Sequence, residues 1–277
     1  MLLGRDFSSV SNKARQMRLK QDRVRVRKGL ERPTLEAARY ISPTEPAVAY
    51  ILGLLWADGC VTHAGAQKVL RVIRHTCRFD DAESFSPVFA SLGGWSTFTY
   101  VNKKAISQAP IVSTSCSNRA LGEHLAALGW KEKGASPQRV LDTIPGELHH
   151  HFYRGYFDGD GCITSQKQIP GNNKYYKRFA IYFSSCGNQD WGFLQSLCAS
   201  LGIKPVVRQM IDKRGVASQL YFASSTQAEA FVRYIYRGHE GLCLARKLNK
   251  AQELLDYQIN PANNKRGRHK LMPAVTL

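Results

Sequence analysis

The chain lacks any apolar run that is long enough to cross a lipid bilayer, and no basic and then apolar leader opens its 277 residues. A transmembrane helix needs roughly 20 consecutive, mainly apolar residues, and a secretory leader has a recognisable charge and length pattern. These two absences exclude a membrane span and a secretory signal. We therefore expect a soluble, intracellular protein with no membrane partner.

Acidic residues are scarce in this sequence. Only 21 Asp and Glu stand against 39 Lys and Arg, which gives a formal net charge of +18. An excess of this size is typical of proteins that neutralise many phosphate groups of a nucleic acid. The composition therefore favours a nucleic-acid partner.

No Cys-x-x-Cys pair is present, and the seven cysteines are an odd number. A zinc ribbon or a complete disulfide framework would require paired, regularly spaced cysteines. We expect reduced and mostly buried thiols instead.

One sequence pattern occurs twice. Residues 152–164 read Phe-Tyr-Arg-Gly-Tyr-Phe-Asp-Gly-Asp-Gly-Cys-Ile-Thr, and residues 50–62 read Tyr-Ile-Leu-Gly-Leu-Leu-Trp-Ala-Asp-Gly-Cys-Val-Thr. The copies align without a gap, 102 residues apart, which is the size of a small domain. This repetition predicts a duplicated unit.

Small residues lie four positions apart in each copy: Gly53 and Ala57 in the first, Gly155 and Gly159 in the second. Residues spaced by four fall on one face of a helix. A face without large side chains lets two helix backbones touch. Each copy is therefore expected to be a helix that packs closely against the other.

Each helix pattern ends in Asp-Gly, at Asp58-Gly59 and Asp160-Gly161. Glycine after a helix usually ends it in the left-handed conformation, which we expect at both positions. A carboxylate at a helix C-terminus opposes the helix dipole, and a second carboxylate nearby adds repulsion. Both penalties call for a cation, and carboxylate ligands with room for water favour Mg²⁺ over zinc.

Both segments resemble the LAGLIDADG motif of homing endonucleases, and the second is close to the usual wording of that motif. The resemblance implies that Asp58 and Asp160 are catalytic metal ligands, with Gly59 and Gly161 in the same metal site. It also implies a site-specific double-strand DNA endonuclease that hydrolyses phosphodiester bonds with Mg²⁺ across the minor groove of a long asymmetric target. Such an enzyme is encoded within introns or inteins or as a free-standing gene, and here we expect a monomer without an obligate protein partner.

Two alternatives stay open. An apolar helix that ends in Asp-Gly is also an ordinary capped core helix, although two aligned copies favour the motif. The same scaffold also serves RNA-binding intron maturases and DNA-binding regulators that do not cleave. The first copy departs from the family at Trp56, where an acidic residue is frequent, as at Asp158. That position is not the metal ligand.

Around the two motifs, strand and helix patterns predict an α+β fold made of duplicated αββαββα units. By resemblance, two curved antiparallel sheets would form a DNA-binding saddle. We expect four regions: a basic N-terminal DNA-binding arm or partial helix-turn-helix at 1–44, the first unit at 45–144, the second unit at 145–257, and a basic tail at 258–277.

Polar residues on the predicted strands are candidate DNA contacts. In the strand that begins at Arg178, period-two alternation puts Phe179, Ile181 and Phe183 on one face and Arg178 on the other. Base edges in the major groove are recognised by Arg, Lys, Gln and Asn. The candidates, each of which could equally be an ordinary solvated residue, are Gln166, Gln168, Arg178, Arg71 and Lys103.

Lys133 and Lys247 each follow one unit. The resemblance implies that such lysines approach the cleavage site, where a cation could polarise water or stabilise developing charge. A solvated lysine is the alternative for each. The run His149-His150-His151 is not a metal cluster, because consecutive helical residues diverge by roughly 100°; we expect these histidines at a surface or boundary.

Overall fold

The computed structural model describes residues 36–64, 70–101, 109–130, 134–168, 176–212 and 215–259. The predicted candidates Lys103 and Lys133, most of the basic arm and most of the tail lie outside these ranges. The described residues all belong to one compact unit that spans 35–277. None of their helices combines the length and the apolar character of a membrane span.

The first half of this unit begins with the short helix α2 and then follows the predicted order. Its elements are α2 (Ala37–Ile41), α3 (Pro46–Asp58), β1 (Gly59–Ala64), β2 (Leu70–Arg78), the 3₁₀ helix η1 (Phe79–Asp81), α4 (Ala82–Ser91), β3 (Ser96–Val101), β4 (Pro110–Ser117), α5 (Arg119–Ala127) and α6 (Gln138–Leu141).

The second half repeats the order from α3 to α5. Its elements are the 3₁₀ helix η2 (Gly146–Leu148), α7 (His149–Asp160), β5 (Gly161–Gln168), β6 (Tyr176–Cys186), α8 (Gly192–Ser200), β7 (Val206–Asp212), β8 (Gly215–Phe222), α9 (Ser225–Tyr236) and α10 (Ala245–Ile259). The predicted duplicated αββαββα architecture is confirmed.

Two additions to the predicted order have clear physical reasons. Helix α2 lies within the predicted arm, but its Tyr40 is buried, so this part of the arm belongs to the first half. Helix α10 was not predicted, although Ala251, Leu254 and Leu255 recur at helical spacing and are buried.

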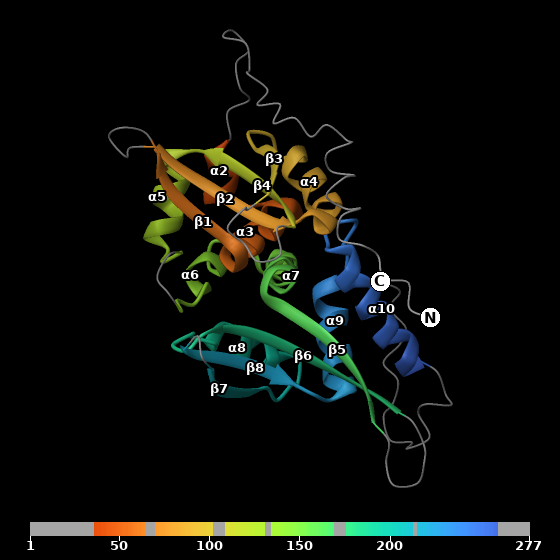
Figure 1. Cartoon of the computed structure of the whole chain (residues 1–277). Helices are drawn as coiled ribbons and strands as arrows, with labels where there is room; N and C mark the ends of the chain where they lie inside the picture. Colours follow the sequence, from red (N-terminus) through yellow and green to blue (C-terminus); the bar gives the residue numbers. More distant parts are fainter. Residues whose placement is uncertain are drawn as a thin grey trace. The chain divides into compact units, whose positions relative to one another are not determined.

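Each half contains one four-stranded antiparallel sheet (Figure 1). The strand orders are β1-β2-β4-β3 and β5-β6-β8-β7. In the second sheet the predicted alternation of β6 is confirmed, because Phe179, Ile181 and Phe183 are fully buried while Arg178 is exposed. One face of this sheet is therefore core, and the opposite face carries polar and charged residues.

Helices α3 and α7 are in contact through their glycines, as the spacing predicted. A Cβ atom on Gly53 would overlap the Phe152 carbonyl oxygen, and one on Gly155 would overlap the Tyr50 carbonyl oxygen. No side chain larger than hydrogen fits at either position, so these glycines set the distance between the two helices.

Gly59 and Gly161 do not adopt the predicted left-handed conformation. Their φ and ψ angles are −76° and 151° at Gly59 and −79° and 158° at Gly161, which is extended backbone. The prediction was wrong because each helix continues directly into a strand. Glycine is needed here for space: a Cβ on Gly59 would lie 2.6 Å from the Trp130 ring, and one on Gly161 would overlap the Phe157 ring.

Candidate active site

The two motif carboxylates end the two central helices. Asp58 is the last residue of α3 and Asp160 is the last residue of α7. A Cβ atom on Gly159 would lie 3.2 Å from Asp58 Oδ2, so the Asp58 carboxylate sits against the last turn of the neighbouring helix. The close helix contact therefore brings both carboxylates to one place, as the sequence predicted.

Burial and mutual repulsion oppose the negative charge of this pair. Burial and the nearby Asp58 carboxylate raise the pKa of Asp160 to about 7, although Lys247 acts in the opposite direction. Burial also raises the pKa of Asp58. A site that holds two oxygen ligands and disfavours their charge is suited to a divalent cation.

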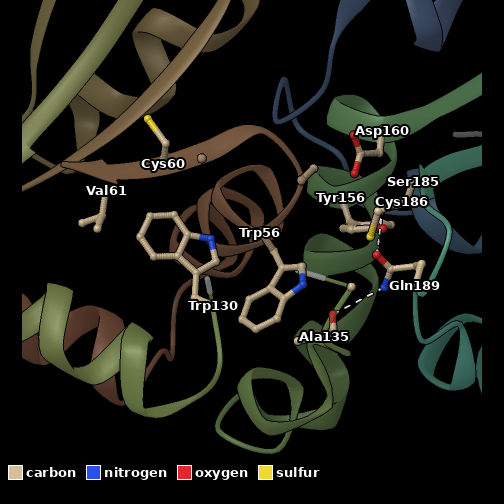
Figure 2. A pocket seen from close by; sticks show the side chains of 13 residues that line it. Trp56, Cys60, Val61, Trp130, Ala135, Tyr156, Asp160, Ser185, Cys186 and Gln189 are labelled. Atoms are coloured by element: carbon tan, nitrogen blue, oxygen red, sulfur yellow. Dashed lines mark hydrogen bonds between the residues drawn. The ribbon is translucent and has the colours of Figure 1, made fainter. Parts of the chain in front are cut away.

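A cavity of about 510 Å³ opens beside Asp160 (Figure 2). Trp56 and Trp130 line it together with Tyr156, and Gln189 borders it from the second half. Gln189 donates a hydrogen bond to the Ala135 carbonyl at 3.4 Å. The cavity therefore lies between the end of α3, the chain that joins the halves, and the second half.

The C-terminal end of α7 is held by Lys247. Its Nζ donates to the carbonyl oxygens of Phe157 at 2.6 Å, Asp158 at 2.7 Å and Gly159 at 3.4 Å. Carbonyls in the last turn of a helix lack the amide donors of a following turn, although Phe157 also accepts a hydrogen bond from the Gly161 amide. A cation at this end of the helix also interacts favourably with the helix dipole. Burial lowers the pKa of Lys247 to about 8. Lys247 thus lies close enough to both carboxylates to lower their pKa values, but all three of its N–H donors bond the end of the helix. Its catalytic role stays a prediction.

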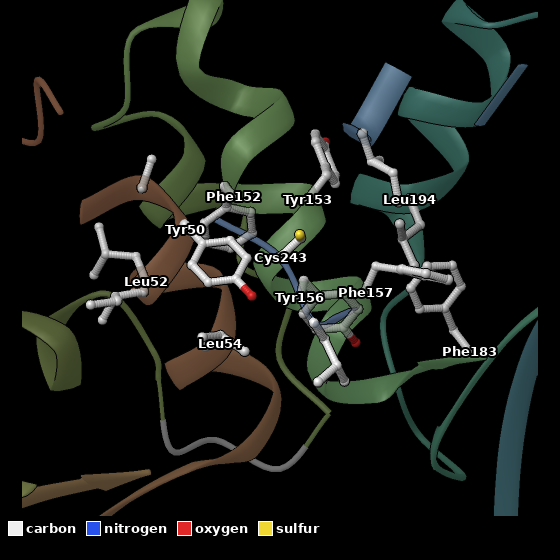
Figure 3. Packing of buried hydrophobic residues seen from close by; sticks show 14 of the residues in the cluster. Tyr50, Leu52, Leu54, Phe152, Tyr153, Tyr156, Phe157, Phe183, Leu194 and Cys243 are labelled. Carbon is white, nitrogen blue, oxygen red and sulfur yellow. The ribbon is translucent and has the colours of Figure 1, made fainter. Parts of the chain in front are cut away.

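Asp158 is buried between several elements rather than exposed in the site. Its carboxylate accepts hydrogen bonds from Tyr50 Oη at 2.7 Å, Tyr236 Oη at 3.3 Å and the Leu244 amide at 2.8 Å. Figure 3 shows Tyr50 on α3 next to the aromatic side chains of α7. Asp158 therefore joins α3, α7 and α9 to the chain that leads into α10.

The first residues of α10 also contact the first half. Arg246 donates to both carboxylate oxygens of Asp81, at 2.9 and 3.2 Å, and the Ala245 amide donates to Ser84 Oγ at 3.2 Å. The Asp81 side chain is only 8% exposed. Together with Lys247, this short segment connects the end of α7 to η1 and α4.

The histidine run was misjudged in part. His149 forms hydrogen bonds with the carbonyl oxygens of Leu141 and Ile144. His150 and His151 are buried, and their ring centroids lie 3.9 Å apart with the rings tilted by 39°. They pack at the start of α7, because this helix is enclosed on several sides. They lie at the opposite end of α7 from Asp160.

The cysteine prediction holds in part as well. All seven cysteines are free. Cys116, Cys198 and Cys243 are buried, whereas Cys60 and Cys162, which follow the two Asp-Gly pairs, are exposed.

Four of the candidate DNA contacts lie on strands of the two sheets, on β2, β5 and β6. Gln166 is paired with Arg178 across β5 and β6, and Gln168 is two positions further along β5. Arg178 is exposed and donates to the Ala223 carbonyl at 2.6 Å. Arg71 lies on β2, where it pairs with His63 of β1. The side chains of Arg71, Gln166 and Gln168 lie outside the described part of the structure, so their contacts with DNA stay predictions.

Sequence reasoning missed several residues on the polar face of the second sheet. Arg208, Gln219 and Tyr221 lie on adjacent strands and contact one another. Strand alternation within β7 could have predicted which face of the sheet Arg208 occupies. Its contacts with Gln219 and Tyr221 could not be predicted, because they depend on how β7 pairs with β8.

Within the described ranges, no group of three or more His, Cys, Asp and Glu side chains could hold a metal ion. The carboxylates of Asp58 and Asp160 would therefore be the charged ligands of a metal at this site. Both present oxygen atoms only, which fits Mg²⁺ better than zinc.

No family profile matches the chain, and no curated protein matches it. Among solved structures it aligns with the I-SmaMI LAGLIDADG homing endonuclease bound to cleaved DNA, at 12% identity and a TM-score of 0.49, covering 85% of this chain and 93% of that one. I-AabMI, a LAGLIDADG meganuclease bound to uncleaved DNA, aligns at 11% identity and a TM-score of 0.47, over 80% and 96%. I-CpaMI, also bound to uncleaved DNA, aligns at 10% identity and a TM-score of 0.49, over 79% and 93%. These structures carry the name of the family that the two motifs resemble.

Proposed function

We propose that this chain is a monomeric, site-specific DNA endonuclease of the LAGLIDADG type. The observation that carries the proposal is the pair Asp58 and Asp160, which two helices in glycine contact deliver to one place. The net charge of +18 supports a nucleic-acid partner. Because one chain supplies both carboxylates, no second copy is required.

In the proposed reaction, Asp58 and Asp160 hold Mg²⁺ and each half of the chain contacts one half of the duplex. A bound Mg²⁺ would polarise the phosphate and stabilise charge on the attacking and leaving oxygens. The residues of this chain have separate tasks. Asp58 and Asp160 bind the ion, while Lys247 and Asp158 fix the end of α7 and therefore the position of Asp160.

The raised pKa of Asp160 supports a role for the cation in charge compensation. Burial and the Asp58 carboxylate raise the pKa of Asp160 to about 7, so near neutral pH part of the Asp160 population is protonated in the absence of a cation. A divalent cation favours the ionised pair and releases that proton. Proton release on Mg²⁺ addition is thus an expected property of the proposed site.

A test of the proposal is incubation of the chain with a randomised duplex DNA library and Mg²⁺, followed by sequencing of the ends. We expect discrete cut sites for the native chain and a loss of cleavage of about a thousandfold or more for Asp58→Asn and for Asp160→Asn. Binding to the selected site should persist in both variants.

The matched control is Asp256→Asn, which removes an exposed carboxylate on α10 that accepts a hydrogen bond from Gln252. It should cleave as the native chain does. Full cleavage by Asp160→Asn would remove the assignment of this carboxylate. Tight RNA binding with no DNA cuts would instead favour the maturase alternative.

A further inference from the structure

The polar face of the second sheet carries an ordered side-chain cluster. We call it the outer face; it is opposite Phe183 and Leu220, which are fully buried. Strand pairing places Tyr182 beside Tyr221, Ser184 beside Gln219, and Arg208 beside Gln219 on this face. The cluster therefore spans β6, β8 and the edge strand β7.

Hydrogen bonds and ring contacts fix the arginine of this cluster. Arg208 donates to Gln219 Oε1 from Nε at 3.0 Å and from Nη2 at 2.7 Å. Its guanidinium lies 4.6 Å from the centre of the Tyr221 ring, and that ring stacks on Tyr182 with centroids 5.8 Å apart. Gln219 in turn donates to Ser184 Oγ at 3.0 Å. Both the position and the plane of the Arg208 guanidinium are thus set before any ligand binds.

This arrangement leaves donors of Arg208 for a ligand. A guanidinium has five N–H donors in a planar fork, and the edge with Nε faces Gln219. Nη1 makes no hydrogen bond or ion pair with the described part of the chain, and the residue is exposed. The remaining edge, formed by Nη1 and the second N–H of Nη2, carries two parallel donors.

The first sheet lacks an equivalent arrangement among its described residues. Arg74 lies over the Phe98 ring at 6.0 Å, but its Nε has no hydrogen-bond partner there. Strand pairing places Ser113, not a glutamine, beside Phe98 on β3. The two halves therefore present different arginine environments, although their backbones repeat.

We propose that Arg208 is a specificity-determining residue that recognises a guanine in the major groove of the half-site bound by the second sheet. Two parallel N–H donors match the O6 and N7 acceptors of guanine, which is the base that arginine recognises most often. Gln219 and Tyr221 are positioning residues, because they hold the fork in one plane and reduce the entropy lost on binding. This inference rests on the proposed DNA-binding function.

A backbone phosphate also accepts two N–H donors from arginine, so the test must separate a base from a phosphate. A base contact alters preference at one position of the target. A phosphate contact changes affinity about equally for all sequences and alters the salt dependence.

The experiment selects bound duplexes from a randomised library without Mg²⁺ and compares site profiles of variants. Arg208→Gln should lose preference for one guanine by about tenfold or more and leave other positions unchanged. Arg208→Lys keeps the charge but not the planar fork, so it should lose the same preference. Gln219→Ala should weaken that preference less, at the same position.

Arg119→Gln is the matched control, since Arg119 is exposed on α5 and pairs with Glu123 away from this face. It should keep the native profile. Equal loss of affinity for all sequences in Arg208→Gln, with an unchanged profile in Arg208→Lys, would overturn the inference in favour of a phosphate contact. An Arg208→Gln variant with native affinity and native profile would overturn it in favour of no DNA contact. If the native chain selects no sequence at all, the proposed function itself fails, which is a distinguishable result.

Discussion

The two central helices carry the same motif but end in different surroundings. At the end of α7, the Lys247 ammonium bonds three carbonyl oxygens and the Asp158 carboxylate accepts three hydrogen bonds. At the end of α3, Trp130 Nε1 donates one bond to the Leu55 carbonyl at 2.7 Å, and Trp56 lines an open cavity. Charged groups thus fix one end, and neutral indoles border the other.

This difference shows how a duplicated scaffold divides its tasks. The glycine contact and the terminal carboxylate occur in both copies, because both are needed to form the pair. The residue two positions before the carboxylate differs between the copies: Asp158 is a buried hydrogen-bond acceptor, whereas Trp56 lines the cavity. Substitutions at the shared positions and at the divergent positions should therefore have different effects on stability and activity.

The largest effect is expected at the shared glycine contact. Gly155→Val would push a side chain into the Tyr50 carbonyl of α3 and force the helices apart. We expect the free energy of unfolding to fall by about 4 kcal/mol or more, measured by urea denaturation. Gly146→Ala is the control, because a Cβ there meets nothing within 4 Å; its effect should stay within about 0.5 kcal/mol.

The second prediction compares the two divergent residues, Asp158 and Trp56. Asp158→Leu would leave Tyr50 Oη, Tyr236 Oη and the Leu244 amide without their acceptor. Unpaired buried donors of this kind cost about 3 kcal/mol of stability together. Trp56→Leu should cost about 1 kcal/mol, because this residue faces a cavity. If thermal or urea unfolding showed an equal loss of stability in the two variants, the two helix ends would not be anchored differently.

The third effect concerns Lys247 and pH. Burial lowers its pKa from 10.5 to about 8, so above pH 8 the folded chain binds fewer protons here than the unfolded chain. Stability contributed by this group therefore rises between pH 8 and pH 10.5, by about 2 kcal/mol. Lys247→Met should remove that rise in a pH series of unfolding measurements.

Lys250→Met provides the comparison for this series. Lys250 is exposed on the same helix and pairs with Glu253. The native rise in stability above pH 8 should persist in this variant. If it disappeared from both variants alike, the buried ammonium of Lys247 would not be its source.

Much of the fold could be predicted because its signals are local. The two motifs aligned without a gap, and helical spacing of Gly53 and Gly155 gave the helix contact. The strands of both halves followed from alternation and turn residues. Asp58 and Asp160 were identified for the same reason, since each ends a recognisable helix pattern.

The rest depended on contacts between distant residues. The role of Asp158 rests on Tyr236 and Leu244, which are 78 and 86 residues away. The Arg208 cluster rests on the register of β7 against β8. Gly59 and Gly161 were assigned the wrong conformation because a helix that continues straight into a strand leaves no room for the usual turn.

The most direct test of the account is a titration of the Asp160 carboxyl carbon by NMR, in the native chain and in Asp58→Asn, without divalent cations. Burial and then Asp58 raise the pKa of Asp160 to about 7. The account therefore predicts a native pKa of about 7, a lower value in Asp58→Asn that stays above the ordinary range because burial persists, and no change in Asp256→Asn. An Asp160 pKa that is the same with and without the Asp58 carboxylate would contradict the claim that the two helices deliver both groups to one shared site.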